Sequence, residues 1–206
     1  IGLQGSFQEN VYRGLPLIPN FRGFSGGVFA YERLSLERLD VEIGTRVDGL
    51  SRAAYLRDGD YEKHVRRETL DESSCTAVSD GQRYRCPADY LAGSVSLGGL
   101  AHLVPERWDL KLDLSTATRF PNVDELYLLG HAPTFPVYAN GFPELGTETV
   151  WNGSLTSGLR VAWLEAEMSG YAQFIEDYIY FSPVINDSGN PKVETTIRGA
   201  YPGWDF

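Results

Sequence analysis

Apolar and polar residues alternate with a period of two along most of this chain. Between residues 39 and 48 the odd positions are apolar apart from one threonine, and the even positions are charged apart from one glycine. The same split occurs over residues 108–114 and 164–174. A period of two indicates a β-strand with one apolar and one polar face, whereas a helix would repeat every 3.6 residues. The sequence therefore predicts an all-β protein.

Weaker alternation extends the predicted strands over most of the remaining chain. It covers residues 1–11, 91–103 and 149–160. Residues 27–36 are strand-like. Their two faces are ambiguous, because Glu32 occupies one of the alternate positions that otherwise hold Val28, Ala30 and Leu34. We predict seven strands, with the start of an eighth after Val193.

The predicted connections alternate between tight and long. Tight turns fall near residues 37–38, 105–107 and 161–163, and long links cover 14–24, 56–88, 119–147 and 182–193. Outer-membrane barrels combine short turns on one side with long loops on the other. The pattern thus favours an antiparallel up-and-down transmembrane β-barrel, with a soluble antiparallel sandwich as the alternative. The link 56–88 is densely charged with both signs, and we expect a solvated loop there.

Composition and charge exclude some classes of protein but do not identify the function. The chain has 206 residues, 18 Lys and Arg against 28 Asp and Glu, and a formal net charge of −10, which argues against nucleic-acid binding. No stretch approaches the roughly 20 apolar residues of a transmembrane helix. Several aromatic residues fall near the predicted strand ends, where a barrel carries aromatic girdles. They are Tyr12, Tyr31, Tyr55, Tyr90, Trp108, Tyr178, Tyr180 and Phe181.

Several stretches resemble the TonB-dependent outer-membrane receptors, among them residues 17–19 with 26–32, and 177–179. Residues 39–48 are similar to a recurrent "LE-x-G-x-R-x-D" strand, and 117–127 (ATRFPNVDELY) to the "FRAP…ELY" segment. Residues 141–145 (GFPEL), followed by 148–152, resemble the "GNPxL" box that comes next in this family. The resemblance covers nearly the whole chain in the expected order.

This resemblance implies that residues 1–206 form part of a barrel domain with about 22 strands. We expect seven or eight of those strands here, with the plug domain absent. The chain starts at Ile1 with no signal-peptide pattern, so we expect an internal fragment. The implied function is uptake of a scarce ligand, an iron–siderophore complex or haem, across the bacterial outer membrane. The implied partners are TonB through the missing plug, the small-molecule ligand and outer-membrane lipid, with no cofactor and no enzymatic activity.

Cys75 and Cys86 both belong to the link 56–88, with ten residues between them. An extracellular loop is an oxidising environment, and a disulfide would restrain a long segment. Two cysteines without nearby histidines make a poor metal site. We expect a disulfide, with free thiols as the alternative.

The segment between the two motif boxes carries the candidate ligand-binding residues. In haem-uptake members of the family, a histidine at the corresponding position is an axial ligand of the iron, and imidazole suits that role. The resemblance extends this role to His131, although Arg119-Phe120-Pro121 and Gly141-Phe142-Pro143 depart from the family pattern. Around it, the uncharged aromatic residues Phe135, Tyr138 and Phe142 could grip an iron chelate. They could equally pack against neighbouring loops.

No arrangement of residues predicts catalysis. Residues 23–27 match the G-x-S-x-G pattern, but a nucleophile elbow must open a helix and the sequence after Ser25 continues as a strand. Neither His64 nor His102 has a triad context. Two other classes remain open: a passive porin or adhesin barrel, and a soluble all-β carbohydrate-binding module.

Overall fold

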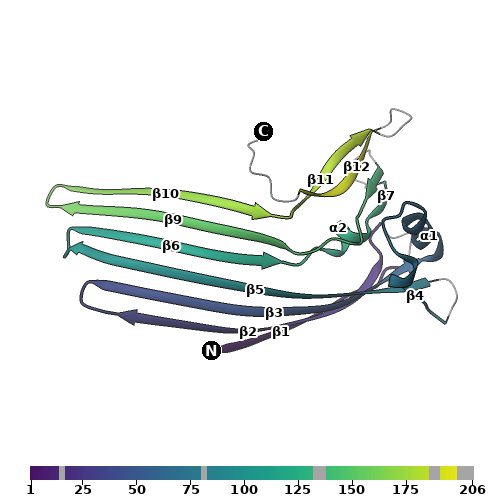
Figure 1. The fold of residues 1–206 in the computed structure, drawn as a ribbon, viewed down its shortest axis with the longest axis horizontal. Helices are drawn as coiled ribbons and strands as arrows, with labels where there is room; N and C mark the ends of the chain where they lie inside the picture. Colours follow the sequence, from purple (N-terminus) through teal and green to yellow (C-terminus); the bar gives the residue numbers. More distant parts are fainter. Residues whose placement is uncertain (14–16, 80–82, 132–137, 186–190, 199–206) are drawn as a thin grey trace.

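The computed structural model contains an antiparallel sheet of long strands that occupies most of the chain (Figure 1). It describes residues 1–13, 17–79, 83–131, 138–185 and 191–198, a few of them in backbone only. The long strands, in both chain and spatial order, are β1 (Gly2–Asn10), β2 (Asn20–Ser35), β3 (Leu39–Arg57), β5 (Arg83–Val104), β6 (Trp108–Arg119), β9 (Glu148–Val161) and β10 (Leu164–Glu176). These seven strands confirm the predicted all-β, up-and-down architecture.

Smaller elements occupy the long links. They are α1 (Asp58–Arg66), the 3-10 helix η1 (Glu72–Ser74), β4 (Thr76–Ala77), which pairs with β5, and α2 (Val123–Tyr127). A second sheet has the spatial order β11 (Tyr178–Ile185), β12 (Pro191–Arg198), β8 (Tyr138–Asn140) and β7 (Leu129–His131). The strand expected after Val193 is β12, and it belongs to this second sheet. Within the described residues, no helix is long and apolar enough to cross a membrane.

The two kinds of connection lie at opposite ends of the long sheet. Figure 1 shows the tight β2–β3, β5–β6 and β9–β10 turns together at the left, which we call the turn end. The helices and the second sheet gather at the right, which we call the loop end. This arrangement is the one that the alternating connection lengths predict.

Strand pairing gathers the apolar positions of all seven strands on one face. Phe7 pairs with Phe24, and Val28 pairs with Val47. Leu97 pairs with Leu114 in the same way. This apolar face also carries Leu3, Leu34, Ile43, Leu91, Val95, Leu112, Trp151, Leu155, Leu159, Met168 and Phe174, all of them exposed. An apolar surface of this extent suits contact with lipid and is rare on a soluble monomer.

The register also resolves the ambiguous strand. Glu32 pairs with Ile43 and therefore lies on the apolar face, close to the turn end. The opposite, polar face carries most of the polar and charged side chains of the long strands, among them those of β3 and β6. Among the aromatic residues expected at lipid interfaces, Tyr55 and Trp108 share the apolar face, whereas Tyr31 and Tyr90 lie on the polar face. For those last two residues the girdle expectation is wrong.

The buried core is small and lies at the loop end. Ala54, Leu56 and Cys86 alternate along β3 and β5 with residues of the apolar face, and therefore belong to the opposite face. The core thus packs against the polar face of the sheet. Its other members come from the links: Tyr61, Leu70, Cys75, Val123, Leu126, Tyr127, Leu145 and Ile179. We call the core and the helices around it the cap.

The link 56–88 differs from the expected solvated loop. It forms α1 and η1, and Tyr61, His64 and Leu70 are buried. Most of the charged residues of this link are exposed, while Leu56, Tyr61, Leu70, Cys75 and Cys86 are buried in the cap. The expectation of a solvated loop is therefore wrong for this part of the chain.

Candidate ligand-binding cap at the loop end

The two sequence boxes that carry the family resemblance meet in the cap. The Phe142 amide donates a hydrogen bond to the Glu125 carbonyl at 2.9 Å, and the Gly141 amide donates to the Leu128 carbonyl at 2.6 Å. Gly141 lies so close to Leu126 that a Cβ at this position would be 2.5 Å from the Leu126 carbonyl carbon and oxygen. The backbone contact therefore requires glycine.

Arg119, the last residue of β6, joins these boxes to the sheet. Its Nε and Nη2 donate to Oε1 and Oε2 of Glu148, at 3.0 and 3.1 Å, and its Nη1 donates to Oε2 of Glu125 at 2.9 Å. Glu125 also accepts the Asn122 amide at 2.7 Å in a capping box that begins α2. Glu148 accepts the Ile179 amide at 2.9 Å, and its side chain is 7% exposed. One guanidinium thus fixes β6, β9 and α2 relative to one another.

A second arginine, Arg52 on β3, lies under the cap. Its Nη2 donates to the Pro121 carbonyl at 2.9 Å, and its guanidinium lies 5.9 Å from the centre of the Tyr90 ring. Tyr90 in turn donates to the Leu145 carbonyl at 3.3 Å. Arg52 is 9% exposed, and its Nε has no hydrogen-bond partner among the described residues.

Helix α1 completes the other side of the cap. Tyr61 stacks on Tyr84 with ring centres 3.7 Å apart. His64 is 1% exposed, and its Nδ1 lies 3.2 Å from the Thr69 hydroxyl. That hydroxyl donates to the His64 carbonyl, so Nδ1 carries the imidazole proton. Burial, reinforced by the charges of Arg67 and Lys63, lowers the pKa of His64 to about 4.

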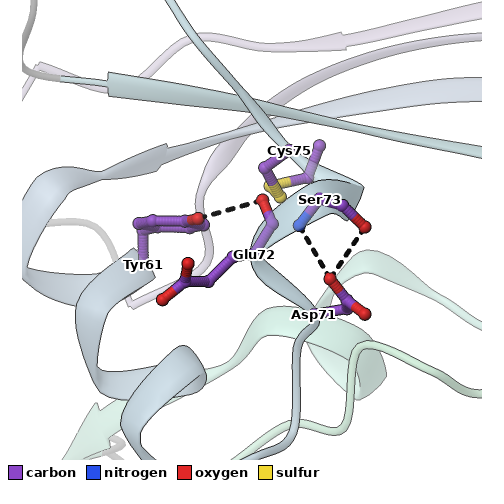
Figure 2. The surroundings of a disulfide bond; sticks show 6 residues. Tyr61, Asp71, Glu72, Ser73 and Cys75 are labelled. Atoms are coloured by element: carbon purple, nitrogen blue, oxygen red, sulfur yellow. Dashed lines mark hydrogen bonds between the residues drawn. A yellow bond between two sulfur atoms is a disulfide. The ribbon is translucent and has the colours of Figure 1, made fainter.

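Cys75 and Cys86 form a disulfide that ties the segment after η1 to β5 (Figure 2). The same view shows how η1 begins: the Ser73 amide and hydroxyl both donate to Asp71 Oδ1 at 2.7 Å. Tyr61 donates to the Glu72 carbonyl at 3.2 Å and links η1 to α1. The disulfide is thus part of a packed segment.

The residues predicted to bind the ligand fall at the edge of the described structure. His131 ends β7, and its backbone pairs with that of Tyr138 in β8. Phe135 lies outside the described residues. Phe142 is half-buried and packs against the buried core of the cap. Among the four, Phe142 therefore has a packing role that the structure describes.

Toward the turn end, the polar face carries paired charges. His102 Nδ1 lies 2.6 Å from Asp109 Oδ1, Lys111 pairs with Asp113 at 2.9 Å, and Arg160 pairs with Glu165 at 2.6 Å. Within the described residues, no three metal-ligating side chains gather as they would around an ion. Such a surface suits an aqueous interior.

Sequence reasoning did not find the Arg119–Glu148 and Arg52–Pro121 contacts. Arg119, Glu125 and Glu148 all belong to the boxes that carry the resemblance, but nothing in their spacing indicates that they meet. One signal could have been used. Arg119 and Glu148 lie at the adjacent ends of two strands joined by a long link, and antiparallel pairing of these strands brings the two ends together.

A sheet with an exposed apolar face, a polar face, tight turns at one end and a folded cap at the other defines the wall of a β-barrel of the outer-membrane type. The sequence model of the family "TonB dependent receptor-like, beta-barrel" matches residues 4–201. The chain therefore belongs to the TonB-dependent receptor family, which consists of transport receptors. This membership removes the soluble carbohydrate-binding module as an alternative.

Solved structures share the fold. The hemophore receptor HasR of Serratia marcescens, in complex with its hemophore HasA and heme, matches with a TM-score of 0.66 and 14% identity, over 93% of this chain and 33% of that one. The copper transporter OprC matches with a TM-score of 0.59 and 19% identity, over 87% of this chain and 25% of that one. The chain thus spans a quarter to a third of these relatives. No curated protein matches it.

Proposed function

We propose that this chain forms part of the barrel wall of a TonB-dependent receptor in the bacterial outer membrane and serves the uptake of a scarce small-molecule ligand. The apolar face would contact lipid, and the polar face would line the interior. The observation that carries the proposal is the family match over residues 4–201, together with the division of all seven long strands into these two faces. Ligand release would depend on TonB acting on a plug domain encoded outside this segment.

We further propose an iron–siderophore complex or haem as the ligand, with the external surface of the cap contributing to its binding. The cap lies over the polar face at the loop end, where a ligand entering the barrel would first meet the wall. Two proteins of similar fold are the hemophore receptor HasR, solved with its hemophore and heme, and the copper transporter OprC, and these two neighbours support a metal-containing ligand. His131, at the end of β7, is the proposed iron ligand if the cargo is haem.

The test is uptake by the complete receptor in cells that lack their other iron-uptake receptors. Growth on haem or on a ferric siderophore as the sole iron source, lost when TonB is deleted, would support the proposal. Growth that is independent of TonB would show a passive channel instead. The variant His131→Ala, with Phe142→Leu as a packing control, then separates haem coordination from cap stability, because loss of growth on haem alone is expected for the first.

A further inference from the structure

Two of the long links contact each other at the loop end through a hydrogen bond between side chains (Figure 1). Nη1 of Arg67, the residue that follows α1, donates to Oδ1 of Asn140, the last residue of β8. Arg67 belongs to the link 56–88, and Asn140 follows 73 positions later in the chain, in the link 119–147. The bond therefore joins the disulfide-bearing segment to the hairpin that β7 and β8 form.

The position of this hairpin depends on the contacts at its base. Each of its strands has only three residues, and a two-stranded hairpin is marginally stable at best when nothing else holds it. The base row pairs Asn140 with Leu129, and both residues are buried. The row that pairs His131 with Tyr138 lies two residues further along, which is about 7 Å. A side chain that holds Asn140 thus also holds the backbone of the candidate iron ligand.

The backbone of Arg67 is fixed by the way in which α1 ends. Glu68 has a φ of 56°, in the left-handed region that commonly closes a helix. Its amide donates to the Val65 carbonyl at 2.9 Å, and the Thr69 amide donates to the His64 carbonyl at 3.1 Å. Arg67 lies directly before this closed turn, so its side chain leaves the helix from a defined point.

Helix α1 is itself attached to the barrel wall. Tyr61 stacks on Tyr84 of β5, and the Cys75–Cys86 disulfide ties the segment after η1 to the same strand. The segment is therefore held at β5 and reaches the hairpin through Arg67. Because its base is fixed, this segment can hold the hairpin in place rather than follow its movements.

We propose that Arg67 is a positioning residue, which holds the β7–β8 hairpin through Asn140 and thereby raises the affinity of the receptor for its ligand. The inference rests on the proposed function, because it requires that the hairpin contacts the ligand, as His131 would. Arg67 itself need not touch the ligand. A hydrogen bond from a charged donor to a buried oxygen is among the stronger ones, so its loss lowers the population of the binding-competent hairpin, and the apparent affinity falls by the same fraction.

The test uses the complete receptor in detergent, titrated with ferric haem and followed by its absorption spectrum. We expect Arg67→Gln to weaken haem binding about tenfold. The matched control is Arg66→Gln, which removes the same charge one residue earlier. The Arg66 side chain is 70% exposed and pairs with Glu62 of the same helix, so this variant should bind haem as the unmodified receptor does. Equal affinities of the two variants would overturn the proposal.

A double-mutant cycle separates positioning from a general effect of charge or folding. In a receptor that already carries Asn140→Ala, the change Arg67→Gln should cause no further loss of haem affinity, because the bond is already absent. An effect of the Arg67 charge on the ligand would not depend on Asn140, and the two losses would add. Additive losses would therefore overturn the positioning role.

Hydrogen exchange without ligand tests the bond independently of the cargo. The amides of β7 and β8 should exchange about tenfold faster in Arg67→Gln than in Arg66→Gln. Faster exchange with unchanged haem affinity would overturn the positioning role. If neither ferric haem nor a ferric tris-catecholate binds the unmodified receptor, the proposed cargo is refuted, and exchange alone decides whether Arg67 holds the hairpin. Unchanged exchange would then overturn this inference as well.

Discussion

Arg119 and Glu148 face each other across β6 and β9 and form a bidentate ion pair, with nitrogen–oxygen distances of 3.0 and 3.1 Å. The glutamate side chain is almost wholly buried, while the Arg119 side chain is 37% exposed. Because Glu148 also accepts the Ile179 amide, its removal would take the acceptor from three N–H groups, two of Arg119 and one of Ile179. The pair therefore fixes where β11 begins as well as where β6 and β9 end.

We expect Glu148→Gln to destabilise the cap by about 2 kcal/mol, less than a fully buried pair would lose because Arg119 remains in contact with water and with Glu125. The measurement is the free energy of unfolding of the complete receptor in detergent, together with hydrogen exchange at Ile179. Glu165→Gln is the matched control. It breaks an exposed pair with Arg160, and its effect on the free energy of unfolding should be much smaller. Equal effects of the two variants would contradict the role assigned to Glu148.

Gly141→Ala should also destabilise the cap, for a steric reason. The added Cβ would lie 2.5 Å from the Leu126 backbone, which cannot move without breaking the contact between the two boxes. We expect a cost of about 2–3 kcal/mol and increased protease cleavage between residues 120 and 147. Gly146→Ala is the control, because nothing lies within 4 Å of its added Cβ. A Gly141→Ala receptor as protease-resistant as this control would refute the contact.

The strands and their faces could be predicted from the sequence because alternation is a local signal. The face on which Glu32 lies could be assigned only from the strand register, because a charged residue among apolar neighbours leaves the two faces of its strand ambiguous. Helix α1 was missed because charged residues dominate its sequence, although Tyr61, His64 and Val65 have helical spacing. The Arg119–Glu148 pair depends on a tertiary contact across 29 positions, which no local pattern encodes. The candidate haem ligand His131 remains a prediction from the resemblance.

The Cys75–Cys86 disulfide should stabilise the segment that follows η1. Closing a loop of this size is expected to contribute about 3 kcal/mol by restricting the unfolded chain. The double variant Cys75→Ser/Cys86→Ser should therefore show faster hydrogen exchange in α1 and η1, whose residue Tyr61 contacts the Glu72 carbonyl. The free thiols of unmodified receptor are counted by alkylation and mass spectrometry before and after reduction. Two alkylated cysteines without reduction would contradict the disulfide.

The stability of α1 should fall as the solution is acidified. Burial holds the pKa of His64 at about 4 in the folded state, against 6.5 for an unperturbed imidazole. The unfolded state therefore takes up a proton first, and the free energy of unfolding should decrease as the pH falls from 6.5 to 4. The full loss would be about 3 kcal/mol.

His64→Gln isolates this contribution from the carboxylates that titrate in the same range. The difference between the two proteins, followed by hydrogen exchange of α1 at several pH values, should change between pH 6.5 and 4 and stay constant above pH 7.5. A difference that does not depend on pH would show that His64 is already protonated, or accessible to water, in the folded cap.

Residues 1–206 expressed alone should not form a stable monomer. In the described structure β1 and β10 end the long sheet, each with one strand partner, so both outer edges expose unpaired backbone groups. Lipid does not tolerate such edges, and in water they pair with other chains. The exposed apolar face adds a second reason for association, because exposing an apolar surface of that extent to water is energetically unfavourable. Light scattering after removal of detergent should show aggregates, whereas the complete receptor in detergent should give a single species. A detergent-free monomer with a sharp, reversible unfolding transition would contradict both the edge argument and the assignment of the apolar face to lipid.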